Sequence, residues 1–116
     1  MIISEFLPDP VGKDIDGEWM ELFNNGASPI NLKGWVIKDA SGKTFKFIKE
    51  TPAEPGAYLK IDYSTSKISL NNNGETIFLY DSSGDLVDKA EYQSKALEGQ
   101  PLSRQGDKFV FNNPKS

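Results

Sequence analysis

The segment DPVGKDIDGEWMELFNNG, near the start of the chain, gathers five carboxylates around one tryptophan. These carboxylates belong to Asp9, Asp14, Asp16, Glu18 and Glu21. Carboxylates at this density can hold a metal ion or act as the acid and the base of a reaction. They can also be the solvated residues of a loop that leads into a strand. The three possibilities predict a metal-dependent binder, an enzyme and an interaction module, respectively.

A calcium site is the first possibility, because Asp14 and Asp16 lie within KDIDGE and Asp9 lies upstream in the same predicted loop. Calcium takes about six to eight oxygen ligands, which Asp-x-Asp-Gly loops and their backbone carbonyls can supply. The spacing does not match the helix–loop–helix calcium motif, and Asp and Gly also form turns in which the carboxylate accepts backbone N–H groups. We prefer the turn interpretation, predict no bound metal and no cofactor, and keep Asp9, Asp14 and Asp16 as calcium candidates.

Catalysis is the second possibility, and the composition restricts it. The chain has no His and no Cys, which excludes Ser-His and Cys-His nucleophile systems. Glu18 and Glu21 are separated by an odd number of positions along one predicted strand, so their side chains point to opposite faces of the sheet and cannot flank one bond. We expect the protein not to be an enzyme; the remaining route would be paired carboxylates from different loops.

Length and charge narrow the class of protein further. The chain has 116 residues, the size of one domain, and a formal net charge of −4 with acidic and basic residues interspersed. Nucleic-acid binding is not expected, since it needs a clustered basic face. No apolar run reaches the roughly 18 residues that span a membrane, and we expect no signal peptide, because a strand pattern begins without a basic segment and an apolar segment ahead of it. We expect either a cytosolic protein or, preferably, a module of a longer chain.

The elements that must position these residues are predicted to be strands. Short segments rich in Val, Ile, Phe, Tyr and Trp alternate with turn residues, and many of them show apolar side chains at every second position. The predicted strands are residues 2–7, 18–24, 34–40, 44–48, 57–62, 75–81, 86–92 and 108–111, with possible short pieces at 30–32, 67–70 and 101–104. No segment shows helical spacing over ten residues. The pattern predicts an all-β fold, a sandwich or barrel of seven to nine antiparallel strands.

The turns support this prediction. DASGKT and DSSGDL place Ser-Gly between two strand segments, as hairpins that need a residue at positive φ require. EPGAY is typical of a type II turn, with Pro fixing φ and Gly in the left-handed position. The asparagines of FNNG and NNNG are predicted to occupy turn positions with positive φ.

The strand EWMELFN is apolar on both faces, with Trp19 and Phe23 on one and Met20 and Leu22 on the other. Such a strand is expected to be central in its sheet and covered on its second side by a loop or a partner. We expect Trp19 to close one end of the core or to lie under the preceding loop, and the core to consume both tryptophans and most phenylalanines.

For three charged residues, the sequence suggests specific side-chain partners or roles. Glu21 is predicted to pair with a cross-strand lysine such as Lys38. Asp88 is predicted to cap a bulge or a turn. Arg104, in PLSRQ, is predicted to pair with a carboxylate of the acidic loop.

Taken in order, four motifs make the chain resemble the lamin tail domain family, in its prokaryotic type. SEFLPDPVGKDIDGEWMELFNNG resembles the opening strand, loop and Glu-Trp strand of the family, and INLKGWVIKDASGKTFKF resembles its Leu-x-Gly-Trp segment and hairpin. EPGAYLKI is similar to the Pro-Gly-x-Tyr turn and strand, and ISLNNNGETIFLYDSSGDLVDKAEY to the Leu-Asn-Asn-x-Gly-Asp segment and the strands that follow. Glu75 stands where the family often has Asp, and the coiled-coil rod and the basic localisation signal of nuclear lamins have no counterpart here, so filament assembly is not carried over.

The resemblance implies an immunoglobulin-like β-sandwich without catalytic function. It also implies a protein-interaction or tethering role within a larger exported or envelope-associated protein, extracellular or in the cell envelope, whose partner is a protein or an envelope component. We expect the domain to cover residues 1–111, followed by a flexible tail at 112–116, and to be a monomer when isolated. The alternative is a calcium-assisted carbohydrate-binding module, which would need exposed coplanar aromatic side chains. DNA tethering is the poorest alternative because of the net charge.

Overall fold

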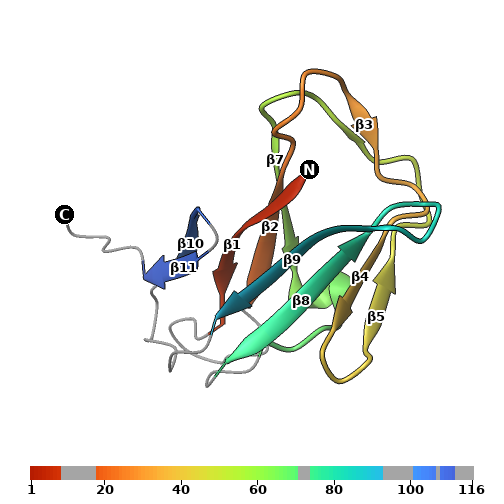
Figure 1. Ribbon diagram of the computed structural model, residues 1–116. Coiled ribbons are helices and arrows are strands. Elements are labelled where there is room, and N and C mark those ends of the chain that lie inside the picture. The colour runs from red at the N-terminus through yellow and green to blue at the C-terminus, as the bar shows by residue number, and fades with distance from the viewer. Residues whose placement is uncertain (9–17, 71–73, 93–100, 107, 112–116) are drawn as a thin grey trace.

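The computed structural model describes residues 1–8, 18–70, 74–92, 101–106 and 108–111, and shows two β-sheets that face each other (Figure 1). The elements are β1 (Ile2–Leu7), β2 (Trp19–Phe23), β3 (Ile30–Asn31), β4 (Val36–Asp39), β5 (Thr44–Lys46), β6 (Pro52–Ala53), β7 (Tyr58–Asp62), α2 (Tyr63–Ser66), β8 (Glu75–Tyr80), β9 (Leu86–Tyr92), β10 (Leu102–Gln105) and β11 (Lys108–Phe111). The predicted tail at 112–116 lies outside the described residues.

All strand pairs that the structure describes are antiparallel. One sheet has five strands in the order β11-β10-β1-β2-β7, and the other has four in the order β5-β4-β8-β9. A small two-stranded ribbon, β3 with β6, completes the fold. The all-β, immunoglobulin-like sandwich is thus confirmed. Two of the labelled strands have only two residues, and β6 is the one strand that the sequence pattern did not predict.

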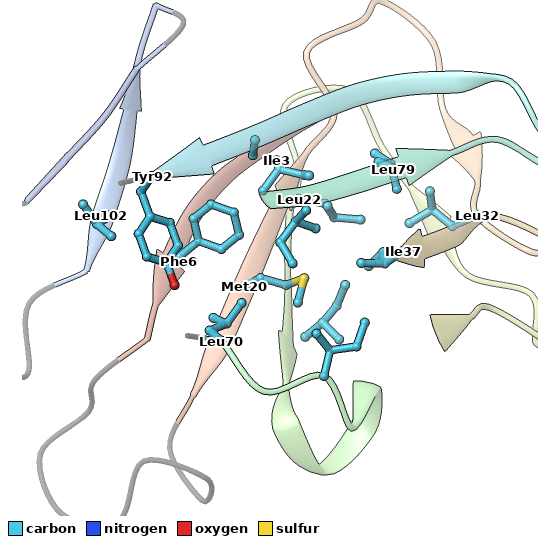
Figure 2. Close-up of a cluster of buried hydrophobic side chains, with 14 of the residues drawn as sticks. Ile3, Phe6, Met20, Leu22, Leu32, Ile37, Leu70, Leu79, Tyr92 and Leu102 are labelled. Atoms are coloured by element: carbon cyan, nitrogen blue, oxygen red, sulfur yellow. The ribbon is translucent and has the colours of Figure 1, made fainter. Parts of the chain in front are cut away.

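The core lies between the two sheets and is built from alternate residues of their strands (Figure 2). Its fully buried side chains include Ile3, Phe6, Met20, Leu22, Leu32, Ile37, Ile68, Ile77, Leu79 and Leu102. The Phe6 ring packs against Tyr92, with 5.4 Å between the ring centroids. Trp35 is partly buried and packs against this core, as predicted.

Strand β2 is central in its sheet, between β1 and β7, which confirms the expectation from its two apolar faces. Met20 and Leu22 are buried in the core, whereas Trp19, Glu21 and Phe23 alternate with them and are only partly buried. The expectation that the core consumes Trp19 is therefore wrong. The residue lies on the face of the five-stranded sheet that points away from the second sheet.

The two Ser-Gly hairpins use the same set of hydrogen bonds. Asp39 Oδ1 accepts from the N–H groups of Ser41 and Lys43, both at 2.9 Å, in the β4–β5 turn. In the β8–β9 turn, Asp81 Oδ1 accepts from the corresponding two N–H groups, at 2.9 and 3.0 Å. The glycines have φ angles of 98° and 89°, as the turn prediction requires. Repeated chemistry in DASGK and DSSGD thus produces repeated turns.

The FNNG segment differs from its prediction. Among the described residues, Lys67 at 60° is the only non-glycine with positive φ, so the asparagines of FNNG do not fill such positions. Asn24 is instead buried: its Nδ2 donates to the carbonyls of Ser28 and Ala53, and its Oδ1 accepts from the Gly26 N–H. The amide therefore replaces main-chain partners that two neighbouring loops lack.

After β7, the chain forms one turn of helix that the sequence pattern did not predict. Asp62 caps its N-terminus by accepting the Thr65 N–H at 3.1 Å, and Lys67 ends it in the left-handed conformation. The hydrogen bonds from Ser64 and Thr65 lower the pKa of Asp62 below its ordinary value of 3.8. The segment 67–70, predicted as a possible strand, is not one in the structure.

An ion pair joins β10 of the five-stranded sheet to β9, an edge strand of the four-stranded sheet. Arg104 Nη2 donates to Asp88 Oδ2 at 2.6 Å, and the same carboxylate oxygen accepts the Ile3 N–H at 2.8 Å. Arg104 Nε donates to the Ile3 carbonyl at 2.9 Å. The register of the β1–β2 pair shifts between Ile3 and Glu5, so Asp88, which accepts the Ile3 N–H, does cap an irregular strand position, as predicted. The expectation that Arg104 pairs with the acidic loop is wrong; its partner comes from β9.

Candidate binding surface

The outer face of the five-stranded sheet carries three rows of side chains that point away from the core, as the strand registers place them. One row joins Leu7, Trp19 and Asp62; the next joins Ser103, Glu5, Glu21 and Lys60; the third joins Ile2, Phe23 and Tyr58. We call this set of residues the outer face. It combines acidic, basic and aromatic groups within the span of four adjacent strands.

Two carboxylates stand opposite each other at its centre. Glu5 and Glu21 are direct cross-strand partners in the β1–β2 pair. Each accepts a hydroxyl: Ser103 Oγ donates to Glu5 Oε2 and Ser4 Oγ donates to Glu21 Oε1, both at 2.9 Å. Like charges directly opposite in a sheet are unfavourable. The two serine hydroxyls offset part of this cost and fix the direction of the carboxylates.

A stacked aromatic pair adjoins these carboxylates. The rings of Phe23 and Tyr58 lie 4.6 Å apart between centroids, with an interplanar angle of 27°. Tyr58 is 63% exposed, which is high for so large a side chain. The pair offers a nearly flat apolar surface that adjoins polar groups, an arrangement typical of binding surfaces.

These groups surround an open groove of about 510 Å³. Its lining residues are Ile2, Ser4, Glu5, Glu21, Phe23, Tyr58, Ser103 and Arg104. We call it the outer groove. Because strands position all eight residues, their relative arrangement is fixed by the hydrogen-bonded sheet rather than by loops.

Trp19 lies at the other end of the same face. The Lys60 Nζ lies 4.2 Å from the centroid of its ring, a cation–π contact that partly covers the indole. On β7, Lys60 is the direct partner of Glu21. The predicted pairing of Glu21 with Lys38 is therefore wrong, since Lys38 lies on β4 in the other sheet.

The carboxylates of the acidic segment separate into different environments. Glu18 is only 2% exposed and accepts the Leu70 N–H, while Glu21 lies on the outer face. This confirms that the two cannot flank one bond. Burial, followed by the charges of Glu75 and Glu18, raises the pKa of the Tyr92 phenol well above its usual range.

The calcium candidates Asp9, Asp14 and Asp16 lie outside the described residues, and calcium binding there stays a prediction.

The described part of the chain shows neither three acidic side chains gathered where a metal ion would fit nor a helix whose length and apolar character would let it span a membrane. The outer face presents hydrogen-bond acceptors, an aromatic surface and a groove. The alternation within β2 already indicated that Trp19, Glu21 and Phe23 share a face. The contributions of Glu5, Tyr58 and Ser103 depend on which strands become neighbours, which local patterns do not reveal.

Comparison with curated proteins finds none that matches the chain. A family model described as Lamin Tail Domain matches residues 1–94, which include both sheets up to the end of β9. The chain therefore belongs to the lamin tail domain family.

Proposed function

We propose that this chain is a noncatalytic interaction module that binds a protein partner or a cell-envelope component through its outer face. The single observation that carries the proposal is the outer groove, where the opposed carboxylates of Glu5 and Glu21 adjoin the stacked rings of Phe23 and Tyr58. Family membership supports the noncatalytic part, since this immunoglobulin-like family is generally non-enzymatic.

The chemistry of the groove favours a partner that presents basic and apolar side chains together. Two carboxylates beside an aromatic pair suit a guanidinium or ammonium group, which the carboxylates attract and the ring faces can stack against. Arg104 also lines the groove, but its guanidinium is already engaged by Asp88 and by the Ile3 carbonyl. The net charge of −4 supports a basic partner as well.

In this proposal the module tethers the remainder of a longer, exported or envelope-associated protein to its site of action. The proposed domain covers residues 1–111 rather than ending where the family match ends. This extent is supported by β10, which pairs with β1, and by β11, which pairs with β10.

The test uses the chain fused to a fluorescent reporter and added to isolated cell envelopes. Wild type should sediment with the envelopes, and Tyr58→Ala should lose about tenfold in affinity, the scale of a central aromatic contact in an interface. Lys89→Ala, on an exposed position of β9 in the other sheet, is the matched control and should bind like wild type. Equal binding of wild type and Tyr58→Ala would contradict the proposal.

A calcium-assisted carbohydrate-binding module is the second candidate function, and the outward aromatic side chains favour it. The exposed ring of Tyr58, stacked on the partly buried Phe23 and with Trp19 on the same face, provides an aromatic surface on which a sugar can stack. Calorimetry against a glycan panel, with and without calcium, separates the two candidates. Calcium-dependent heat and a raised melting temperature support the carbohydrate module, whereas binding of basic protein ligands without calcium supports the interaction module.

A further inference from the structure

A second groove, distinct from the outer groove, lies where edge strands of the two sheets approach each other. Strand β7 ends the five-stranded sheet and β5 ends the four-stranded sheet, and both contribute residues to a cavity of about 380 Å³. Its lining residues are Phe45, Lys46, Phe47, Ile48, Lys49, Thr51, Leu59, Lys60, Ile61 and Thr65. We call it the edge groove.

The edge groove is more apolar than the outer groove, and part of its apolar surface is open to solvent. Ile48 is 74% exposed, the highest value among the large hydrophobic side chains of the described residues. Phe45 and Leu59 are only partly buried, although both pack against the core. Exposed apolar surface that continues into the core is typical of a place where a partner inserts its own side chains.

The charge of the edge groove is positive. Lys46, Lys49 and Lys60 line it, and none of its ten lining residues is acidic. This contrasts with the net charge of −4 of the whole chain and with the two glutamates of the outer groove. A ligand that complements the edge groove therefore carries negative charge as well as apolar groups.

The main chain of β7 adds the third feature. The Asn24 N–H donates to the Ala57 carbonyl and the Tyr63 N–H donates to the Glu18 carbonyl, so the odd-numbered positions of this segment form the hydrogen-bonded pairs with β2. In an antiparallel pair, the intervening positions direct their N–H and C=O groups away from the partner strand. At Lys60, these groups point toward the groove side of the sheet edge and can receive an added strand.

From these three features we propose that the edge groove binds an extended segment of a partner protein in which apolar and acidic residues alternate. The segment pairs with the free edge of β7 as an additional strand. Its apolar side chains point to one side, onto Phe45, Leu59 and Ile48, and its carboxylates point to the other, toward the lysines. The edge groove shares Lys60 with the outer face but no residue with the outer groove, so either groove can fail to bind without the other.

The charge pattern selects a peptide over the other possible occupants. Three lysines around an apolar floor give no continuous basic track for a phosphate backbone, and the overall negative charge opposes nucleic acid. A symmetric dimer formed through this edge would place the lysines of one edge groove against those of the other, which is unfavourable. The experiment distinguishes all three occupants.

The probe is the peptide acetyl-Glu-Val-Glu-Phe-Glu-Val-Glu-amide, titrated into the whole chain by calorimetry and by NMR. Saturable binding should shift the amide signals of residues 44–49 and 58–62. The double variant Lys46→Glu/Lys49→Glu should bind about tenfold more weakly, because each reversal places a negative charge beside a peptide carboxylate. Ile48→Ser should bind about fivefold more weakly, and it should fold normally since the side chain is so exposed.

Two matched controls isolate the mechanism. Lys38→Glu/Lys89→Glu makes the same change in net charge at exposed positions outside the groove, and should bind within about twofold of wild type. The same peptide N-methylated at every residue has no main-chain N–H with which to pair as a strand and should not bind.

The proposal is overturned if the alternating peptide does not bind wild type. Equal weakening by both double variants would also overturn it, because the effect would then be one of net charge alone. Two further results would replace the peptide with another occupant. Nucleic acid would be the occupant if duplex DNA binds with a steep salt dependence and Lys46→Glu/Lys49→Glu abolishes that binding. A second copy of the chain would be the occupant if sedimentation shows a concentration-dependent dimer that the same double variant abolishes.

Discussion

Strand β2 presents Met20 and Leu22 to one side of the five-stranded sheet and Trp19 and Phe23 to the other. The two sets are similarly apolar, yet Leu22 is fully buried while Trp19 and Phe23 are only partly covered. The difference arises from what covers each face: the four-stranded sheet packs on the inner face, whereas, among the described residues, the outer face is covered by side chains of its own sheet, such as Lys60 over Trp19.

The two faces of β2 show that the apolar character of a strand residue does not by itself determine whether the residue is buried. On the inner face, side chains contribute to stability by removing apolar area from water. On the outer face, the same kinds of side chain remain available to a ligand. Substitutions on the two faces should therefore change different measured quantities, stability on one and binding on the other.

The largest effect is expected from the inner face. Leu22→Ala removes a fully buried side chain and should lower the free energy of unfolding by about 2–5 kcal/mol. Tyr58→Ala, on the outer face, should lower it by less than about 1 kcal/mol, mostly through loss of the stack on Phe23. Urea denaturation followed by circular dichroism measures both. Similar losses for the two variants would remove the distinction between the faces.

The next largest effect concerns the boundary between the faces, where Arg104 reaches from the outer groove to Asp88. Asp88→Ala leaves the guanidinium and the Ile3 N–H without this partner in a mostly covered site, and should cost about 1–3 kcal/mol. Glu50→Ala is the matched control, because it breaks the exposed 3.2 Å pair with Lys33 and should not measurably change the denaturation midpoint. Equal shifts in both variants would show that the Arg104 pair has no special role.

A smaller effect is expected within the outer face itself. Lys60→Met removes the ammonium above the Trp19 ring and should cost about 0.5–1 kcal/mol. In a Trp35→Phe background, the fluorescence of Trp19 alone should change in the same variant. The control is Lys89→Met, which should alter neither quantity; an unchanged Trp19 emission in Lys60→Met would argue against the contact.

The smallest effect is a pH dependence of the free energy of unfolding, caused by Asp62 at the end of the row that contains Trp19. The pKa of Asp62 is lowered in the folded state by hydrogen bonds from Ser64 and Thr65, so its contribution to stability is complete above its ordinary value of 3.8. That contribution is lost as the pH falls below 3.8 and through the folded-state pKa. NMR titration of the Asp62 carboxyl carbon should give a midpoint below 3.8, and Asp62→Asn should lack this component of acid destabilisation. A midpoint at or above 3.8 would contradict the cap.

The sequence predicted most of the strands, because period-two alternation and Ser-Gly or Pro-Gly turns are local signals. Residues 86–92 and 2–7 form strands with the predicted bounds, and the DASGKT and EPGAY turns have their glycines at positive φ. The β3–β6 ribbon was only half predicted, since β6 comprises Pro52 and Ala53, which are poor strand formers.

The wrong predictions about side-chain partners concern contacts between residues far apart in the chain. Arg104 donates to the Ile3 carbonyl across 101 positions, and Glu21 lies opposite Lys60 rather than Lys38 because β7, not β4, lies beside β2. The outward position of Trp19 has the same origin: alternation shows that two faces exist, but the second sheet decides which of them is buried. Such choices depend on sheet order, which no local pattern contains.

The most direct test of the binding role proposed for the outer face is photo-crosslinking from a benzophenone side chain placed at position 58 of this chain, incubated with isolated cell envelopes. The same probe at position 89, in the other sheet, reports background. If the outer face binds a partner, position 58 should give a specific adduct that excess unlabelled protein suppresses, and position 89 should give none. Adducts of equal yield from both positions, or none from position 58, would contradict it.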